Sequence, residues 1–348
     1  MFLSQFRRTP PAYLVPQTEG LRWLSEAHAR CGGDATAEQF AKLLRRYGCG
    51  PDKIEERGTF VRDFTHLNWA DMQIFADRET AADASRRMAF FNEVLMKPVA
   101  GMYTQERPGF KNWIHVTCTG YVSPSVIQQL CSVKGWGSEV ECLHAYHMGC
   151  YAALPALRMA RGNLSCEILH TELCTLHLDP FHHDPEQLVI QSLFADGVIA
   201  YRVEEHAPEL GYEVLQLREH VAPATLDQMR WDVSQNGFKM TLAREVPKHV
   251  QSGVRGLVSG WQDAGCVYAI HPGGPRIIDA VKESLGLSEE QVFFSREILR
   301  RHGNMSSATL PHVWQRMLDE IPAGTRVISM AFGPGLTLSG SLMRKACG

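Results

Sequence analysis

A cysteine near the middle of the chain, Cys150, directly follows a glycine in the stretch His144-Ala-Tyr-His-Met-Gly-Cys-Tyr-Ala-Ala-Leu-Pro-Ala-Leu-Arg158. The residues after it predict a helix, so the thiol is expected at a helix start. N-terminal N–H groups and the helix dipole favour the thiolate there. Cys150 is therefore a candidate nucleophile, although a lone cysteine is more often a small buried hydrophobic residue. Pro155 predicts a kink or an open turn in that helix.

Three further features could converge on this thiol. His271 ends a predicted strand at 267–271 and precedes Pro-Gly-Gly. Asn304 lies between a predicted helix at 289–301 and small residues that open another helix. The stretch Phe332-Gly-Pro-Gly-Leu-Thr337 predicts a rigid turn that lets two backbones approach closely. A strand-end histidine and a helix-capping asparagine are ordinary structural features alone, so only their joint pattern indicates chemistry.

The elements that must position these residues alternate between two periods. Helices are predicted at 17–31, 37–47, 80–101, 123–130, from Cys150 to 161, and at 275–285; strands are predicted at 113–118, 139–143, 165–171, 198–202, 267–271 and 326–332. This alternation indicates an α/β core. A looser polar stretch at 204–235 places a boundary between two halves near 205–215.

Composition bounds the class of protein. The chain has 348 residues, of which 45% are hydrophobic and 21% charged, the values of an ordinary globular protein. Its N-terminus, Met1 to Arg8, has too short an apolar run for a signal peptide, which favours the cytoplasm. The ten cysteines form no C-x-x-C pair and are expected to be reduced. A net charge of −3 makes nucleic acid an unfavourable partner.

Four motifs carry a family resemblance. They are Gly149-Cys150, Ile270-His-Pro-Gly-Gly274, Gly303-Asn-Met-Ser-Ser307 and Phe332-Gly-Pro-Gly-Leu-Thr337. In this order and at these separations they resemble the chalcone synthase superfamily, the type III polyketide synthases. The resemblance covers about residues 105–343.

The resemblance implies a fold and an assembly. The expected fold is a thiolase-like αβαβα arrangement of five layers, made of two related halves. Residues 1–210 would form the half with the nucleophilic cysteine, and residues 211–348 the half with the catalytic histidine and asparagine. The family works as a homodimer on acyl-CoA, malonyl-CoA or acyl carrier protein thioesters, without a cofactor, a metal or a membrane.

The resemblance also implies roles for three residues. Cys150 would accept the starter acyl group, and His271 would hold it as a thiolate through an ion pair. Decarboxylation of a malonyl thioester gives an enolate, whose oxygen needs two hydrogen-bond donors. His271 and Asn304 would supply them, an arrangement whose loss costs on the order of 10²–10³ in rate.

Substrate-binding positions follow from the same resemblance. Phe194 and Met240 fall where two aromatic residues gate the cavity, and Met240 would leave an adaptable opening. The other expected substrate-binding residues are Cys118, Thr119, His177, Trp231, Ser306, Phe332, Gly333 and Pro334. Trp231 replaces a glycine of the chalcone-forming plant enzymes, so a smaller pocket and a product other than chalcone are expected. Ser123 replaces a methionine that crosses between subunits.

The thioester carrier is expected at basic residues near the N-terminus, namely Lys42, Arg45, Arg46 and Lys53. Glu55 and Glu56 replace basic residues that often follow. This favours either weaker coenzyme A binding or an acyl carrier protein as donor. The basic residues could equally form a solvated helix face.

Alternatives remain open. The main interpretation is a synthase that extends a starter to a pyrone or a resorcinol- or phloroglucinol-type polyketide; the nearest alternative is a ketosynthase that joins two β-ketoacyl chains from acyl carrier proteins into an α-pyrone. A cysteine hydrolase could use the same three residue types. Zinc could bind His144-x-x-His147-x-x-Cys150 or the histidines and aspartates of 177–184.

Overall fold

The computed structural model describes residues 1–346 except 33, 163 and 235. Its centre is a nine-stranded mixed sheet of order β11-β12-β13-β8-β1-β7-β6-β4-β5. The strands are β1 Phe2–Thr9, β4 Asn112–Thr117, β5 Glu141–Tyr146, β6 Cys166–Leu173, β7 Asp196–Glu204, β8 Gly211–Val221, β11 Val267–Ile270, β12 Arg326–Gly333 and β13 Thr337–Lys345. All residues of β4 and β6 are buried, including the polar and charged ones.

The sheet divides into two arms at the contact between β1 and β8. Strands β1, β4, β5, β6 and β7 form one arm, and β8, β11, β12 and β13 form the other. The two arms join where Phe2, Leu3 and Ser4 pair with the start of β8. In each arm a parallel pair lies at the outer edge, β4 with β5 and β11 with β12. The expected division at 210/211 falls in the connection before β8, and the relatedness of the halves stays a prediction.

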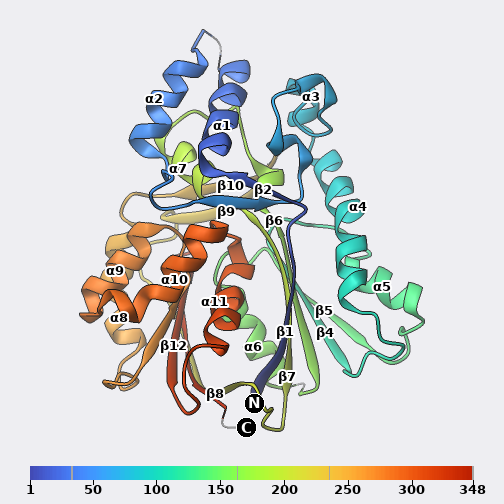
Figure 1. The fold of residues 1–348 in the computed structure, drawn as a ribbon, viewed down its shortest axis with the longest axis vertical. Helices are drawn as coiled ribbons and strands as arrows, with labels where there is room; N and C mark the ends of the chain where they lie inside the picture. Colours follow the sequence, from blue (N-terminus) through green and yellow to red (C-terminus); the bar gives the residue numbers. More distant parts are fainter. Residues whose placement is uncertain (33, 163, 235, 347–348) are drawn as a thin grey trace.

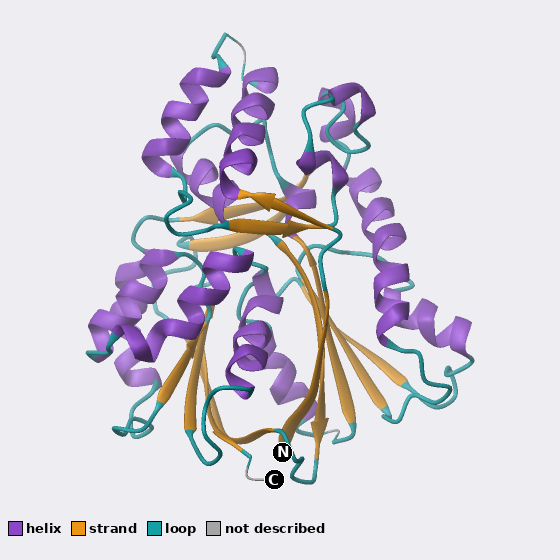
Figure 2. Cartoon of the chain, in the orientation of Figure 1, coloured by secondary structure: helices purple, strands orange, loops and turns teal. Residues whose placement is uncertain are grey.

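Helices form three layers, one between the two arms and one on the outside of each arm. The layer between the arms contains α6 Ala153–Ala160 and α11 Thr309–Leu318 (Figure 2). Helix α6 is rich in alanine, and most of its residues are buried. Helices α4 Ala84–Met102 and α5 Val126–Lys134 cover the outside of the first arm. Helices α8 Val246–Leu257 and α9 Pro275–Leu285 cover the outside of the second, and α10 Glu289–His302 lies along its edge strand β11, where Ser295 Oγ accepts a hydrogen bond from the N–H of Ile270. The five layers of the expected αβαβα arrangement are therefore present.

A further group of elements lies across one end of both arms (Figure 1). It comprises α1 Gln17–Cys31, α2 Ala37–Tyr47, α3 Arg78–Ala81, α7 Pro185–Leu193, the hairpin of β9 Met229–Ser234 and β10 Gly237–Leu242, and the pair of β2 Tyr13–Pro16 and β3 Glu56–Thr59. Short 3-10 turns lie at Arg62–Thr65, Trp69–Asp71, Cys174–His177 and Ser306–Ala308. No helix in the described part of the chain is both long and apolar enough to span a membrane.

Several predicted elements are confirmed, and one prediction is wrong. The helices expected at 17–31, 37–47 and 275–285 have those bounds. The polar stretch at 204–235, expected to be irregular, contains β8 and β9. Most of β8 after Val214 is exposed or half-buried, so its polar residues do not prevent it from pairing with β13 along its length. The nine cysteines among the described residues are all free thiols.

Candidate active site

The turn that carries Cys150 connects β5 to α6. Helix α6 begins at Ala153, so Cys150 lies three residues before the first helical position instead of at the helix start itself. Pro155 lies in the first turn of α6, where a backbone N–H has no intrahelical partner, so the helix continues through it. Gly149 has φ +85, a left-handed conformation that favours glycine. The thiol itself is buried.

The glycine–proline turn between β12 and β13 packs directly on this cysteine turn. A Cβ atom at Gly149 would lie 2.5 Å from Cδ of Pro334. A Cβ atom at Gly333 would lie 2.1 Å from Cδ1 of Tyr151. Each glycine therefore lies against a side chain of the other turn, which leaves no room for a side chain at either glycine.

His271 and Asn304 line one cavity together with Cys150, with a volume of about 390 Å³ that includes the open space at its mouth. His271 follows β11, and its backbone N–H donates to Met330 O at 2.7 Å. Among the described residues, neither ring nitrogen of His271 has a hydrogen-bond partner. Both nitrogens therefore remain available to a bound molecule.

The amide of Asn304 has a fixed orientation. Its Oδ1 accepts a hydrogen bond from the backbone N–H of Ser306 at 2.9 Å. Its Nδ2 makes a long hydrogen bond of 3.3 Å to Gly273 O. Because the oxygen is held by the backbone, the NH₂ group is the part of the amide that can donate into the cavity.

Burial dominates the electrostatics of the pair. It raises the pKa of the Cys150 thiol to about 12 and lowers the pKa of His271 to about 3. Ser306 Oγ, 3.8 Å from the sulfur, favours the thiolate, while the charge of Glu172 opposes it. Without a bound substrate, burial thus favours a neutral thiol and a neutral imidazole over the ion pair that the sequence predicts.

Cys150 also lines a second cavity of about 660 Å³, a volume that includes its mouth. Eight of the expected substrate-binding residues line it, namely Cys118, Thr119, His177, Phe194, Trp231, Met240, Ser306 and Pro334. Phe332 lines the first cavity. Gly333 is absent from the described lining of both and packs on Tyr151 instead.

The two cavities meet at a small set of side chains. Cys150, Phe194, Met229 and Met240 line both of them. Phe194 follows α7, while Met229 lies on β9 opposite Leu242 and Met240 lies on β10 opposite Trp231, and both methionines are buried. One aromatic ring and two flexible thioethers therefore separate the His271 side of the thiol from the larger cavity.

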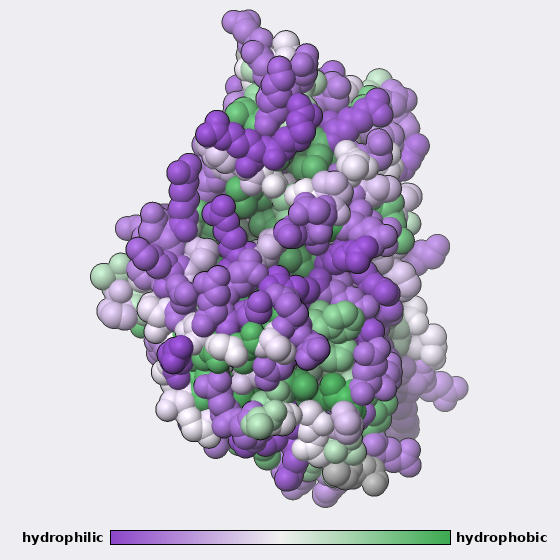
Figure 3. All heavy atoms as spheres, turned by 60° about the vertical axis from the view of Figure 1, so that its left-hand side comes forward, coloured by the Kyte–Doolittle hydropathy of each residue, from purple (hydrophilic) through white to green (hydrophobic). Residues whose placement is uncertain are grey.

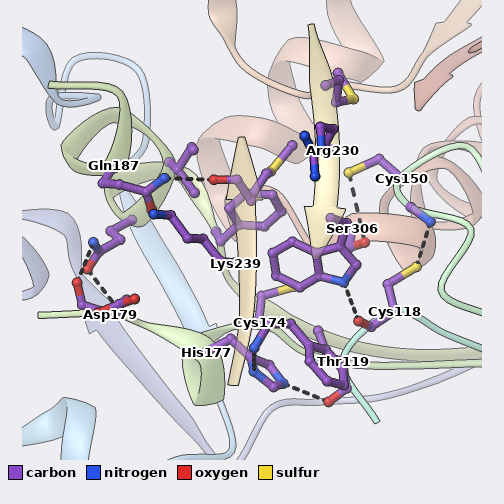
Figure 4. Close-up of a pocket in the computed structure, with 18 of the residues that line it drawn as sticks. Cys118, Thr119, Cys150, Cys174, His177, Asp179, Gln187, Arg230, Lys239 and Ser306 are labelled. Atoms are coloured by element: carbon purple, nitrogen blue, oxygen red, sulfur yellow. Dashed lines mark hydrogen bonds between the residues drawn. The ribbon is translucent and has the colours of Figure 1, made fainter. Parts of the chain in front are cut away.

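The β9–β10 hairpin covers the larger cavity and is hydrogen-bonded to Cys118 on another side of that cavity (Figure 4). The indole Nε1–H of Trp231 donates to Cys118 O at 2.6 Å. His147 Nε2 lies 2.6 Å from Trp231 O, so it carries the proton of that hydrogen bond. Trp231 therefore forms part of the cavity wall, and the hydrogen bond of its indole N–H fixes the orientation of its ring.

His177 is a structural partner of the same hairpin. Its Nε2 donates to Thr119 O at 2.7 Å, and its Nδ1 accepts from the N–H of Phe238 at 3.1 Å. The ring stacks on Phe238 at 4.5 Å between centroids. Burial lowers the pKa of His177 to about 3. These contacts fix a neutral tautomer and leave His177 as a wall of the cavity.

The sequence analysis does not identify Glu172, a buried carboxyl group that lies next to Cys118. Glu172 accepts hydrogen bonds from the N–H of Cys118 at 3.0 Å, from the hydroxyl of Thr119 at 2.9 Å and from Ser307. Burial raises its pKa to about 7. The signal in the sequence is a glutamate directly after the predicted strand at 165–171, and every residue of the observed strand β6 is buried.

The expected carrier residues lie outside both cavities. Lys42 pairs with Glu38 at 3.2 Å, and Lys53 with Asp52 at 3.4 Å, in exposed positions. Arg45 and Arg46 are exposed on α2. The side of the molecule that carries α2 is largely hydrophilic (Figure 3).

The histidines considered as zinc ligands have other partners. His144 Nε2 lies 2.9 Å from Ser125 Oγ, and His147 contacts Trp231 O. His182 Nδ1 lies 2.7 Å from Asp179 Oδ2. Within the described ranges, no three His, Cys, Asp or Glu side chains converge to hold a metal ion.

The chain is similar to several known proteins. A family model of the C-terminal domain of chalcone and stilbene synthases matches residues 213–347. 1,3,6,8-Tetrahydroxynaphthalene synthase of Streptomyces coelicolor is 29% identical, over 66% of this chain and 65% of that protein. Alpha-pyrone synthesis polyketide synthase-like Pks18 of Mycobacterium tuberculosis is 30% identical, over 65% of this chain and 63% of that protein. The chain thus spans slightly less than two thirds of these two relatives.

Solved structures share the fold over the whole chain. The C-terminal type III polyketide synthase domain of 'Steely1', a type I/III hybrid from Dictyostelium, superposes with a TM-score of 0.84 at 24% identity, over 99% of both chains. The structure of 1,3,6,8-tetrahydroxynaphthalene synthase from Streptomyces coelicolor superposes with a TM-score of 0.81 at 22% identity, over 100% of both chains. These likenesses confirm the thiolase-like fold. The match of residues 213–347 and the relatives confirm the resemblance of this chain to the chalcone and stilbene synthases, the type III polyketide synthases.

Proposed function

We propose that this chain is an acyltransferase that forms carbon–carbon bonds. It loads an acyl starter on Cys150 and condenses it with a malonyl-derived extender by decarboxylative Claisen chemistry. The observation that carries this proposal is the cavity shared by a buried thiol and two groups with available donors, His271 and Asn304. The similarity to chalcone and stilbene synthases and to 1,3,6,8-tetrahydroxynaphthalene synthase supports the same reaction class.

Acyl loading needs a base next to the thiol. As the thioester carbonyl approaches, the Cys150 proton passes to the neutral imidazole of His271 and the sulfur attacks the carbonyl carbon. The carrier thiolate leaves and takes up the proton, which yields acyl-Cys150 and free carrier thiol. Coupling proton transfer to attack avoids a long-lived charge pair in a site where burial opposes both charges.

The extension step uses the same donors differently. A malonyl thioester loses CO₂, and the electrons of the broken bond form an enolate. An N–H of His271 and the Nδ2–H of Asn304 donate to the enolate oxygen, as in an oxyanion hole. The carbanion attacks the acyl-Cys150 carbonyl, the Cys150 sulfur leaves, and the chain is longer by two carbons.

The larger cavity would hold the growing chain. The fixed indole of Trp231 in its wall favours a short polyketide that closes to a pyrone or to a resorcinol- or phloroglucinol-type ring. The relatives named for an alpha-pyrone and for tetrahydroxynaphthalene support products of this size class. We assign the coenzyme A or carrier protein moiety to the side of the exposed basic residues Arg45 and Arg46.

We also propose that the active form is a homodimer, as the resemblance to the type III polyketide synthases implies. Strand β5 ends the sheet and presents an unpaired edge. Near it, Tyr121 is 59% exposed, and its ring contacts that of Tyr146 of β5 in a tilted arrangement with 5.8 Å between the centroids. Sedimentation velocity tests this assembly, and a monomer under assay conditions contradicts it.

The decisive experiment incubates the purified chain with a panel of acyl-CoA and acyl-carrier starters and malonyl-CoA, with product mass as the readout. Condensed products that lengthen by two-carbon units support the proposal. A product that joins two β-ketoacyl thioesters without malonyl-CoA supports the ketosynthase alternative. Hydrolysis alone contradicts both. Cys150→Ala is the matched variant, which should abolish acyl loading on the protein.

A further inference from the structure

Arg57 is a buried cation with no carboxylate partner in direct contact. It lies in β3, opposite Val15 of β2, with 0% of its surface exposed. Within the described part of the chain, its Nε and Nη2 have no hydrogen-bond partner. Burying a guanidinium with unpaired donors costs free energy, and an apolar side chain of similar size avoids that cost. The presence of an arginine at this position is therefore better explained by the need to hold neighbouring groups in place than by a contribution to the stability of the fold.

The remaining nitrogen of Arg57 holds the end of helix α7. Nη1 donates to Gln191 O at 2.7 Å and to Phe194 O at 2.9 Å. Phe194 is the C-cap of α7, where the carbonyl groups lack intrahelical partners and the helix dipole favours a positive charge. The guanidinium thus fixes the backbone of the residue whose ring separates the two cavities.

Neighbouring glycines make room for this side chain. A Cβ atom at Gly20 of α1 would lie 2.7 Å from Arg57 Nη2. A Cβ atom at Gly303 would lie 3.1 Å from Arg57 Cγ and 3.0 Å from Leu193 O. The second of these glycines directly precedes Asn304, so Arg57 packs against the backbone that presents that amide.

Leu193 to Ala195 also hold Asn304 directly. The N–H of Asn304 donates to Leu193 O at 2.9 Å, and the N–H of Ala195 donates to Asn304 O at 2.9 Å. Phe194 and Asn304 thereby form a parallel bridge outside the named strands. The segment from Leu193 to Ala195 therefore determines the positions of both the Phe194 ring and the Asn304 side-chain amide in the cavity.

We propose that Arg57 is a positioning residue that holds Phe194 and Asn304 in place around Cys150. It acts through the carbonyl groups of α7 and touches no reacting atom. The inference rests on the proposed function for its activity readout, but it also makes a prediction about access to the thiol that needs no turnover.

The test compares Arg57→Met and Arg57→Lys with the wild type. In Arg57→Met, kcat for condensation should fall about 10²-fold, the loss that accompanies a displacement of catalytic groups by about 1 Å. In the same variant, Cys150 should react faster with a bulky maleimide, because Phe194 loses its anchor. Arg57→Lys keeps one donor and the charge, so it should recover part of both changes.

Arg202→Met is the matched control for removing a buried arginine. Arg202 is 8% exposed and donates to Pro108 O at 3.0 Å and to Glu167, away from both cavities. It should lower the melting temperature without raising the maleimide rate. An Arg57→Met protein with wild-type maleimide rate overturns the proposal. A wild-type protein that forms no condensed product overturns the proposed function instead, and the maleimide comparison still decides the role of Arg57.

Discussion

Gly149 lies against the ring of Pro334 so closely that a Cβ atom at position 149 would lie 2.5 Å from Pro334 Cδ. The glycine also has φ +85, which other L-residues adopt only with strain. Gly149→Ala should therefore push the cysteine turn away from the glycine–proline turn. We expect a loss of acyl loading on Cys150 measured by protein mass, together with a lower melting temperature.

The matched control is Gly256→Ala in the exposed last turn of helix α8, where a Cβ atom meets nothing within 4 Å. Alanine forms helices better than glycine, by up to about 0.5–1 kcal/mol. This variant should melt slightly higher and load acyl groups normally. Normal loading by Gly149→Ala contradicts the role of the close contact.

The ionisation of Cys150 should respond to Glu172. Burial raises the thiol pKa to about 12, and the charge of Glu172 contributes to the same direction. Glu172 itself has a pKa raised to about 7 by burial, so it is charged above that pH. The rate of Cys150 alkylation by iodoacetamide should rise with pH without a plateau near neutrality. Glu172→Gln should accelerate it above about pH 7 and leave it unchanged below about pH 6.

The pH profile supplies its own control for that variant. A faster reaction at every pH would indicate a loosened cavity and not a removed charge, and a lower melting temperature would accompany it. A plateau in the wild-type rate at about pH 5–6 would show that the thiolate–imidazolium pair exists before substrate binds.

Sequence patterns predict the nucleophile and its neighbours because glycine and proline carry local geometry. The strand end before His271 and the turn at 332–337 follow from residue types alone. The contribution of Glu172 could not be predicted, because the sequence does not show which hydrogen-bond donors surround a carboxyl group in a strand. The role of Arg57 could not be predicted either, because its hydrogen-bond partners are the backbone carbonyls of Gln191 and Phe194, which lie far from it in the sequence.

The strand β8 shows a different limit. Its first residues Tyr212 and Val214 are buried, but most later positions face solvent or a partly open surface. The alternation that normally marks a strand is therefore lost after four residues. The pairing that holds it, with β13 along its length and with β1 at its start, is a long-range property of the sheet.

Asn304 should matter for the extension step more than for loading. Its Nδ2–H is one of two donors available at the site of the proposed enolate, so Asn304→Ala should lower kcat on the order of 10²–10³-fold. Asn304→Asp is the matched variant, because it keeps the oxygen that accepts from Ser306 and removes the NH₂ group. Retention of kcat by Asn304→Asp would show that the amide nitrogen does not stabilise the transition state.

Trp231 should set the size of the product. Its indole lines the larger cavity and donates to Cys118 O at 2.6 Å. Trp231→Gly removes the ring and should shift products toward longer chains or bulkier starters, read by mass. Trp231→Phe keeps an aromatic wall but loses the hydrogen bond, so it should retain the product range while loosening the hairpin. An unchanged product range in Trp231→Gly contradicts a role of the ring in chain length.

Buried neutral histidines should make the fold sensitive to acid. Burial lowers the pKa of six of them to about 3, namely His28, His115, His170, His177, His271 and His312. Between about pH 3 and 6.5 the unfolded chain therefore binds more protons than the folded one, so stability rises with pH in that window and is lost as pH falls through it. Glu172 and Asp196 oppose this trend, because burial raises their pKa values to about 7 and about 6, but they are fewer. The urea midpoint should fall clearly between about pH 7.5 and pH 5, and a midpoint that stays constant or rises on acidification would show that these histidines are protonated in the folded protein.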